Sequence, residues 1–265
     1  MVTLAIHGLE AAYGRKRILH GIDLPDIRSG QVTAVLGANA VGKSTLFRRI
    51  AGLIPGAGRV LVDGVPIAER PPRHPLRAFY MPQDHSVSAV LNVFDAVLLS
   101  IKQGSGWRVT DADADAVTET LITLEIGDLA QRSLGELSGG QRQLVAIAQA
   151  LVCGSRMLLM DEPTSALDLQ RQVEILELLR RVAVSRDAIV LVALHDLNQA
   201  LTFSDRVIVL RDGALAAFGR PAEVLTPDML REAYGVEARL ETCSKSRPLI
   251  IVDRSVRSMA GPDLG

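Results

Sequence analysis

The sequence predicts an α/β protein in which a sheet is flanked by helices and interrupted by an inserted helical region. Three short apolar runs, Val32–Leu36, Met157–Met160 and Ala188–Leu194, each end in polar residues. Short apolar runs bounded by turns are typical of buried parallel strands. Between residues 90 and 153 the apolar spacing changes to that of helices. Together these patterns predict a sheet whose two halves are separated by helices.

The first part of the chain, up to about residue 83, is expected to hold strands and turns around one helix. Strands are predicted at Thr3–His7, Arg59–Val62 and Ala78–Met81. The helix is predicted over Lys43–Ala51, because Gly52 follows it directly and glycine commonly closes a helix.

The inserted region contains two groups of apolar residues at helical spacing. They comprise Leu91, Phe94, Val97, Leu98 and Ile101, and then Val117, Leu121, Ile122 and Leu124. The run Asp111–Ala116 alternates acids with alanine but lacks the central glycine and final glutamate of a calcium loop. We expect it to cap the second helix, because carboxylates are favoured at a helix N-terminus.

After Arg156 the alternation of strands and helices resumes and ends near Leu240. A strand is predicted at Arg206–Arg211 and a helix at Pro227–Tyr234. The last 25 residues contain one apolar run, Leu249–Val252, and we expect the polar end after it to be frayed.

Composition excludes several classes of protein. The chain has 265 residues, 48% of them hydrophobic and 22% charged, which is an ordinary globular balance. The net charge of −1 gives no electrostatic reason to expect nucleic acid as a partner. Its two cysteines match no metal or redox spacing. No basic leader is evident and no apolar run approaches the about 20 residues of a membrane span, so we expect a soluble, cytoplasmic chain.

The segment Gly37–Thr45 follows a predicted strand and opens a predicted helix, with the spacing Gly37-x4-Gly42-Lys43-Ser44. Glycines at these positions let backbone N–H groups turn toward phosphate oxygens, and the helix dipole adds positive potential. We expect Lys43 to reach the β- and γ-phosphates and the Ser44 hydroxyl to hold Mg²⁺. The segment predicts a nucleoside triphosphate site.

Asp161 and Glu162 follow the second apolar run, and His195 follows the third. Ligands of an open parallel sheet bind beyond the carboxyl ends of its strands, so these groups are expected beside the lysine loop. One carboxylate can hold Mg²⁺ while its neighbour polarises the attacking water. The alternative is a pair of solvated turn residues.

The stretch Leu137–Gln143 predicts a second anion-binding helix terminus. Ser138 is a good N-cap, and Gly139 and Gly140 come next. A plain capped helix explains the serine but not two glycines, which weaken a first turn. Two such termini in one chain indicate either two nucleotides or one nucleotide shared between chains.

With these motifs in this order, the chain resembles the ATP-binding cassette (ABC) ATPases over nearly its whole length. Gly37–Thr45 resembles the Walker A loop, Leu137–Gln141 the LSGGQ signature and Met157–Glu162 the Walker B strand. Ser165–Asp168 is similar to the D-loop, and His195 to the switch histidine. Gln83 looks like the Q-loop glutamine, and Tyr13 stands where the family places a ring against adenine.

The resemblance implies a P-loop NTPase core over residues 1–83 and 156–240, with a mixed sheet and an N-terminal antiparallel β region. It also implies a helical signature subdomain over 84–155 and a C-terminal tail over 241–265. Glu162, His195 and Gln83 would be catalytic, and Ser44, Gln83 and Asp161 would hold Mg²⁺. The implied ATP contacts are Tyr13, Gly37, Asn39, Gly42, Lys43, Ser44, Thr45, Ser138, Gly139, Gly140, Gln141 and Asp168.

In this family two cassettes face head to tail, so the resemblance implies that Ser138 and Gly140 of one copy would contact the γ-phosphate held by Lys43 of the other. The implied partners are a second copy, two membrane-spanning permease subunits and, indirectly, a periplasmic or surface substrate-binding protein. The chain would lie at the cytoplasmic face of the cell membrane, with no nucleic acid bound.

Four features look like the importer subfamily for ferric siderophores, haem and cobalamin: His195–Ala200, the turn Asp212-Gly213, Pro221–Leu225 and Tyr234–Ala238. We favour a ferric siderophore, with haem, cobalamin or an oxyanion as alternatives. Non-transport ABC ATPases usually carry a long coiled coil or a second cassette, which this chain lacks. Glu162 and His195 argue against a regulator without turnover.

The lysine loop departs from the family pattern at three positions. Ala38 and Ala40 stand where proline and glycine are usual, and Val41 replaces a small residue. We expect both alanines to avoid positive φ, which glycine tolerates freely. The expected consequence is weaker binding or a changed loop rigidity, not loss of activity.

Overall fold

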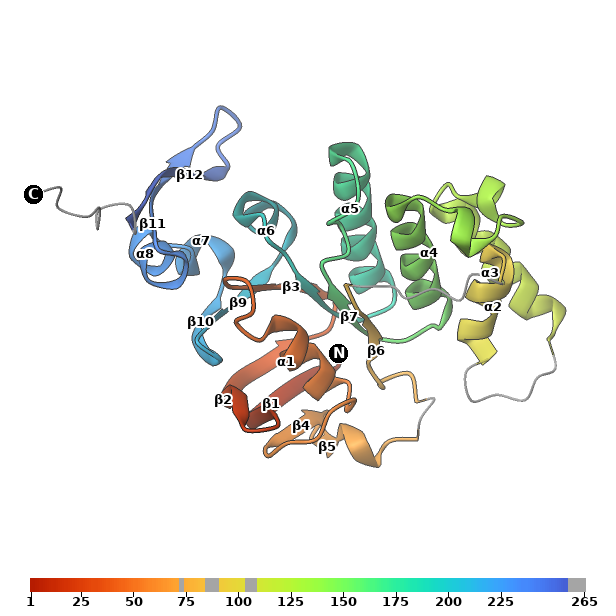
Figure 1. The fold of residues 1–265 in the computed structure, drawn as a ribbon, viewed down its shortest axis with the longest axis horizontal. Helices are drawn as coiled ribbons and strands as arrows, with labels where there is room; N and C mark the ends of the chain where they lie inside the picture. Colours follow the sequence, from red (N-terminus) through yellow and green to blue (C-terminus); the bar gives the residue numbers. More distant parts are fainter. Residues whose placement is uncertain (72–73, 84–90, 103–108, 257–265) are drawn as a thin grey trace, which may run out of the picture.

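A computed structural model of the chain describes residues 1–71, 74–83, 91–102 and 109–256 (Figure 1). The strands are β1 (Thr3–Tyr13), β2 (Lys16–Arg28), β3 (Gln31–Leu36), β4 (Arg59–Val62), β5 (Val65–Pro66), β6 (Phe79–Met81), β7 (Met157–Asp161), β8 (Ile189–Ala193), β9 (Arg206–Arg211), β10 (Ala214–Gly219), β11 (Val236–Thr242) and β12 (Pro248–Ser255). The α-helices are α1 (Lys43–Ile50), α2 (Val93–Lys102), α3 (Asp111–Thr123), α4 (Gly139–Val152), α5 (Leu169–Ser185), α6 (Leu197–Phe203), α7 (Pro221–Val224) and α8 (Pro227–Tyr234).

The central sheet has the strand order β10-β9-β3-β8-β7-β6. The pairs from β9 through β6 are parallel, and β10 pairs antiparallel with β9. The predicted mixed α/β class is therefore confirmed. Because β3 lies between β8 and β9, the turns after β3, β7 and β8 gather at one edge of the sheet.

A second, antiparallel sheet has the order β2-β1-β4-β5 and lies below the central sheet in Figure 1. Helix α1 fills the space between the two sheets. Its Leu46, Phe47 and Ile50 share one buried cluster with side chains of β1, β2 and one face of the central sheet. The helix that begins at the lysine loop is thus held from both sides.

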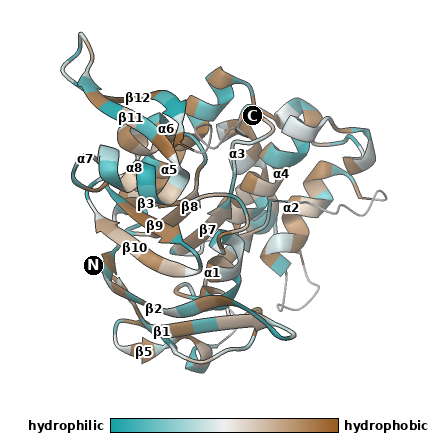
Figure 2. Cartoon of the chain, turned by 60° about the vertical axis from the view of Figure 1, so that its left-hand side comes forward, coloured by the Kyte–Doolittle hydropathy of each residue, from teal (hydrophilic) through white to brown (hydrophobic). Residues whose placement is uncertain are grey.

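The opposite face of the central sheet is covered by α5, α6 and the inserted helices. The strands alternate, so that Val35 points to one side while Ala34 and Leu36 join the cluster on the other. That cluster runs without a break into α2, α3 and α4. Because the core and the helical region share it, the boundaries at 83/84 and 155/156 stay predictions. Figure 2 shows hydrophobic colouring on strands at the centre of the molecule.

The helical region follows the predicted pattern within its described residues. The cap of α3 is Thr110, whose side chain accepts from the Asp113 N–H while Asp113 bonds back to Thr110. The acidic run thus forms the first turn and completes a capping box instead of supplying the cap itself.

The end of the chain folds further than expected. β11 and β12 form an antiparallel hairpin that pairs Val236 with Ser255 and Thr242 with Pro248, with one register shift between Glu237 and Ala238. The expectation of a frayed end is therefore wrong for residues 253–255, while 257–265 lie outside the described residues. The Asn198 side chain bonds both backbone groups of Ile250, which fixes β12 to α6. Among the described residues, no helix has the length and apolar character needed to cross a membrane.

Candidate nucleotide-binding site

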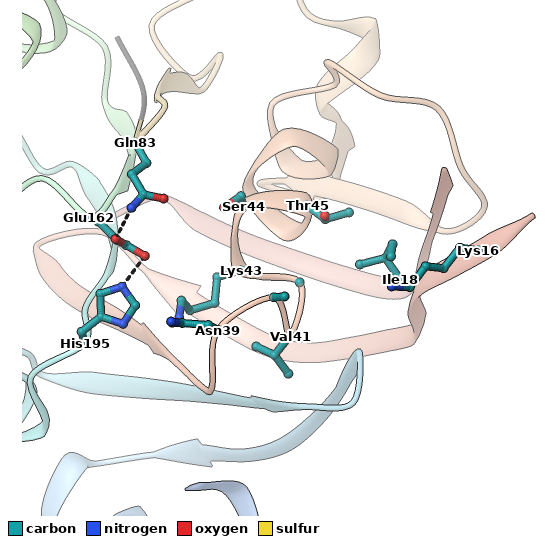
Figure 3. Close-up of a pocket in the computed structure, with 12 residues that line it drawn as sticks. Lys16, Ile18, Asn39, Val41, Lys43, Ser44, Thr45, Gln83, Glu162 and His195 are labelled. Carbon is teal, nitrogen blue, oxygen red and sulfur yellow. Dashed lines mark hydrogen bonds and ion pairs between the residues drawn. The ribbon is translucent and has the colours of Figure 1, made fainter. Parts of the chain in front are cut away.

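The lysine loop, a carboxylate and a histidine surround one cavity of about 420 Å³ at the predicted edge of the sheet (Figure 3). Its lining comprises Lys16, Ile18, Asn39, Ala40, Val41, Gly42, Lys43, Ser44, Thr45, Gln83, Glu162 and His195. Eight of these residues were predicted as site residues, and they come from the loop after β3, from α1, from the turn after β6, and from the segments that follow β7 and β8. The structure therefore brings half of the sixteen predicted site residues together at this cavity.

The first turn of α1 is built to leave its amides free. Gly42 precedes the helix with φ +112°, and no described side chain caps it. A Cβ on Gly42 would lie 2.9 Å from Leu19 Cδ2, so this position requires glycine. The first N–H groups of a helix have no intrahelical acceptor, and together with the dipole they favour an anion.

Ala40 contradicts the expectation that both loop alanines avoid positive φ, because its φ is +60°. An L-residue in this left-handed region costs about 1–2 kcal/mol. The loop has to reverse direction between β3 and α1, and that geometry overrides the local preference of alanine. Ala38 does adopt an ordinary backbone conformation.

The Lys43 side chain is buried and donates a hydrogen bond from Nζ to the Gly37 carbonyl oxygen at 2.9 Å. Burial lowers the pKa of Lys43, while the carboxylates of Glu162 and Asp161 act in the opposite direction. The ammonium group is therefore held inside the loop, close to two carboxylates, with a neutral carbonyl as its hydrogen-bonding partner.

Glu162 is 8% exposed, and both of its carboxylate oxygens are engaged. His195 Nε2 lies 2.5 Å from one oxygen, and Gln83 Nε2 donates to the other at 2.6 Å (Figure 3). The Glu162 backbone has φ +55°, a sparsely populated conformation of the kind that clusters at functional sites. Three residues from three separate turns thus meet at one carboxylate.

Asp161 ends β7 and is 1% exposed. The Tyr80 hydroxyl donates to its Oδ2 at 3.2 Å, while Oδ1 is buried with no partner among the described residues. Burial and the nearby Asp161 raise the pKa of Tyr80 to about 12, so its hydroxyl remains protonated. A buried carboxylate oxygen without a partner among the described residues and the Ser44 hydroxyl of the loop are both oxygen donors of the kind that a hard cation such as Mg²⁺ prefers.

The signature residues line a different cavity, of about 690 Å³. Ser138, Gly139, Gly140, Gln141 and Asp168 all contribute to it, and among described residues it shares no lining with the first cavity.

The predicted N-cap is confirmed, since Ser138 Oγ accepts from the Gln141 N–H and Gln141 Oε1 accepts from the Ser138 N–H. A Cβ on Gly140 would lie 2.9 Å from the Ala166 carbonyl oxygen, which accounts for that glycine.

Three predicted residues lie outside the described lining of both cavities. Gly37 contacts the site through its carbonyl oxygen, which accepts a hydrogen bond from Lys43 Nζ, and Asp161 directly precedes Glu162 in the chain. Tyr13 is 46% exposed, and its hydroxyl accepts a hydrogen bond from Arg48. Its role beside adenine stays a prediction.

Sequence reasoning missed several residues of the site. Lys16 and Ile18, from the start of β2, line the first cavity. The buried Gln143 of α4 donates to the Glu162 carbonyl oxygen at 2.7 Å and accepts from the Ala166 N–H at 2.9 Å. It ties the signature helix to the segment that follows Glu162. Gln141, which lies two positions earlier on α4, was predicted as a site residue. The side chains of Gln141 and Gln143 leave the helix on different faces, so the first does not indicate the contacts of the second.

A glycine-rich lysine loop between a parallel strand and a helix, with an acidic strand end opposite, defines a P-loop nucleoside triphosphatase. The family described as ABC transporter matches residues 19–165, which is more than half of the chain. The chain belongs to the ABC transporter family. It is an ATP-binding subunit, an ATPase coupled to transport, and such subunits work with membrane permeases.

Relatives of this family match the chain over almost its whole length. The hemin import ATP-binding protein HmuV of Streptomyces coelicolor is 38% identical over 95% of this chain and 90% of its own. The probable siderophore transport system ATP-binding protein YusV of Bacillus subtilis is 33% identical over 91% and 88%. A solved metal-chelate type ABC transporter in an inward-facing conformation matches with a TM-score of 0.82 and 27% identity, covering 97% of this chain and 99% of that one.

Proposed function

We propose that this chain is the ATPase of an importer for a metal chelate, with a ferric siderophore as the favoured cargo. The observation that carries the ATPase mechanism is the separation of the two predicted phosphate-binding faces into two cavities of one chain. Neither cavity brings the lysine loop together with the signature, so a complete site needs a second copy.

In the proposed mechanism the loop amides and Lys43 bind the phosphates of ATP. Lys43 Nζ leaves the Gly37 carbonyl for the β- and γ-phosphates. One oxygen of Glu162 is released by His195 or Gln83 and accepts a proton from water as the water oxygen attacks the γ-phosphorus. The bond from that phosphorus to the bridging oxygen breaks, giving ADP and inorganic phosphate.

Ser44, Asp161 and Gln83 would hold Mg²⁺ beside the loop. When bound, Mg²⁺ neutralises charge that develops on the phosphate oxygens. Tyr80 fixes one oxygen of Asp161 and leaves the buried Oδ1 available.

The signature face of the second copy would close the site head to tail. Ser138 uses its oxygen as an acceptor within its own capping box, so its hydroxyl proton can be donated to a γ-phosphate oxygen. ATP then binds the closed dimer more tightly than the open one, and hydrolysis reverses that preference. We place this homodimer at the cytoplasmic face of the membrane, on two permease subunits that receive cargo from a binding protein.

The choice of cargo rests on similarity. The YusV relative is named for siderophore transport, and the solved neighbour is of metal-chelate type. The HmuV relative is named for hemin import, which makes haem the second candidate. Cobalamin and an oxyanion remain the further alternatives, because the cargo touches the permease and the binding protein and not this chain.

The test is purification of a tagged Glu162→Gln chain from detergent-solubilised membranes with ATP, followed by mass spectrometry. We expect a polytopic permease and a second copy of the chain. The wild-type complex is then placed in lipid nanodiscs, and ATPase stimulation is compared for binding protein loaded with ferric siderophore, haem or cobalamin.

Strongest stimulation by the ferric siderophore supports the proposal. Strongest stimulation by haem or cobalamin replaces the cargo and keeps the importer. Recovery of ribosomal or DNA-repair proteins without a permease would overturn the transport role.

A further inference from the structure

The phosphate loop has a contact from the far end of the chain that the mechanism above does not use. The Gly37 N–H donates to the Tyr234 hydroxyl oxygen at 2.8 Å, across 197 residues of sequence. The Gly37 carbonyl accepts from Lys43 Nζ at 2.9 Å. Both polar groups of this glycine are thus engaged, one by the lysine and one by the tyrosine.

Gly37 sits where the loop leaves β3, and it has little room. Its φ is +143°, and a Cβ there would lie 2.5 Å from the Leu210 carbonyl oxygen on β9. Its place therefore depends on close backbone contact with β9 and on its hydrogen bonds. A shift of Gly37 would move every amide that follows in the loop.

Tyr234 is a rigid support for this contact. It is the last residue of α8, which packs against β9 and β11 and buries Leu230 completely. Burial raises the pKa of Tyr234 to about 12, so the hydroxyl is neutral at physiological pH. The hairpin that follows is fixed to α6 by Asn198, independently of the tyrosine.

We propose that Tyr234 is a positioning residue that holds Gly37 while Lys43 exchanges the Gly37 carbonyl for the phosphates of the nucleotide. Before ATP binds, Gly37 is restrained from both sides. Once Lys43 leaves, the Tyr234 hydroxyl is the side-chain partner that remains. The loop is thereby kept in its phosphate-binding shape, and less ordering is needed on binding. The proposal rests on the proposed role of this loop in binding ATP.

The test compares Tyr234→Phe with a matched control at the other end of the same helix, Thr226→Ala. The phenylalanine keeps the ring and removes only the hydroxyl. The Thr226 hydroxyl accepts from the Met229 N–H, so its loss weakens α8 without touching the loop. Calorimetry on the full chain measures Kd for ATP and for ADP, hydrogen exchange follows the Gly37 amide, and the ATPase assay separates KM from kcat.

For Tyr234→Phe we expect both Kd values to rise about threefold to tenfold, the range for one lost hydrogen bond. KM should rise with them, kcat should stay within twofold, and Gly37 exchange should accelerate. For Thr226→Ala we expect a lower melting temperature with both Kd values within twofold of wild type.

Equal nucleotide affinity in wild type and Tyr234→Phe would overturn the proposal and leave the loop's role intact. Equal weakening in both variants would also overturn it, because the cause would then be a weakened helix. Failure of the wild-type chain to bind ATP would instead remove the proposed role of the loop on which the inference rests.

Discussion

Two helices of this chain begin at a predicted phosphate-binding terminus, and they are built in opposite ways. α1 begins after Gly42, which is buried, has φ +112° and receives no cap from a described side chain. α4 begins after Ser138, which is exposed and forms a complete capping box with Gln141. The N-terminus of α1 therefore has no cap from the side chains that the structure describes and begins at a buried residue. The N-terminus of α4 is capped within the chain and begins at an exposed residue.

This difference indicates which terminus depends on a ligand. The first amides of α1 belong to residues that line the cavity, and they receive no cap from a described side chain, so the start of α1 gains strongly from phosphate oxygens. The start of α4 is already paired within the chain and gains less, which suits a surface that meets its nucleotide only in a second copy. We therefore expect changes at the start of α1 to affect the binding of ATP to a single chain. Changes at the start of α4 should instead affect ATP turnover by a pair of chains.

The largest effect is expected at the carboxylate beside α1. Replacing Glu162 by Gln removes the proposed proton acceptor, and turnover should fall by about 10²–10³-fold, as for loss of one positioned polar group. ATP binding should be retained, because the loop is unchanged. Steady-state ATPase assays and ATP calorimetry measure both quantities. A normal turnover rate in this variant would remove Glu162 from the mechanism.

Gly37 and Gly140, one beside each of the two helix starts, both face a backbone carbonyl oxygen and test the comparison directly. Gly37→Ala places a Cβ 2.5 Å from the Leu210 oxygen, and strain of about 1–3 kcal/mol should weaken ATP binding to a single chain roughly tenfold. Gly140→Ala places one 2.9 Å from the Ala166 oxygen, on the signature face. We expect it to lower turnover by about tenfold or more through misplacement, with single-chain ATP affinity within twofold. The reverse pattern would contradict the assignment of the two faces.

The strain at Ala40 predicts that replacing this residue by glycine stabilises the protein. Ala40→Gly relieves about 1–2 kcal/mol at φ +60°, and the added freedom of glycine in the unfolded chain offsets about 0.5–1 kcal/mol. The free energy of unfolding, measured with urea, should rise by about 0.5–1 kcal/mol. Ala38→Gly is the matched control, because that residue is not strained, and it should lower stability. Two changes of the same sign would show that the backbone angle of Ala40 does not matter.

The smallest effect concerns pH and the two tyrosines on the α1 side. Burial raises the pKa of Tyr80 and of Tyr234 to about 12 from 10.0. Because the folded state raises the pKa of these acids, it favours their neutral form. The contribution of each neutral tyrosine to the free energy of unfolding is therefore fully present below pH 10 and is lost as the pH rises toward 12. A difference ultraviolet titration of wild type against Tyr234→Phe should show the missing tyrosine ionising near pH 12. Ionisation at its ordinary value would contradict the burial of this hydroxyl.

Much of the site could be predicted because its motifs are local. A strand, a turn and the start of a helix lie within residues 32–45, and the glycine and lysine spacing follows from that geometry alone. The same holds for Ser138, whose cap partner lies three residues away. The ends of β7 and β8 could be placed at the loop because parallel strands present the same edge.

Other features could not be predicted, because they depend on contacts between distant parts of the chain. Nothing around Gln143 indicates that its amide will pair with the Glu162 carbonyl and the Ala166 N–H. The wrong expectation for Ala40 came from its residue type, whereas its φ is set by the path from β3 to α1. The hairpin of β11 and β12 was missed because Asn198, some fifty residues earlier, holds one of its strands.

The sequence by itself therefore determined the α/β class, the lysine loop, the acidic strand end and the signature cap, since each follows from hydrogen bonding and periodicity over a few residues. Only the tertiary structure decided how these parts are held. It placed His195 and Gln83 on the two oxygens of Glu162, left one oxygen of Asp161 without a partner, and brought Tyr234 to Gly37. The physical reason is that a side chain's partner across the fold depends on how whole elements pack, which no short stretch of sequence specifies.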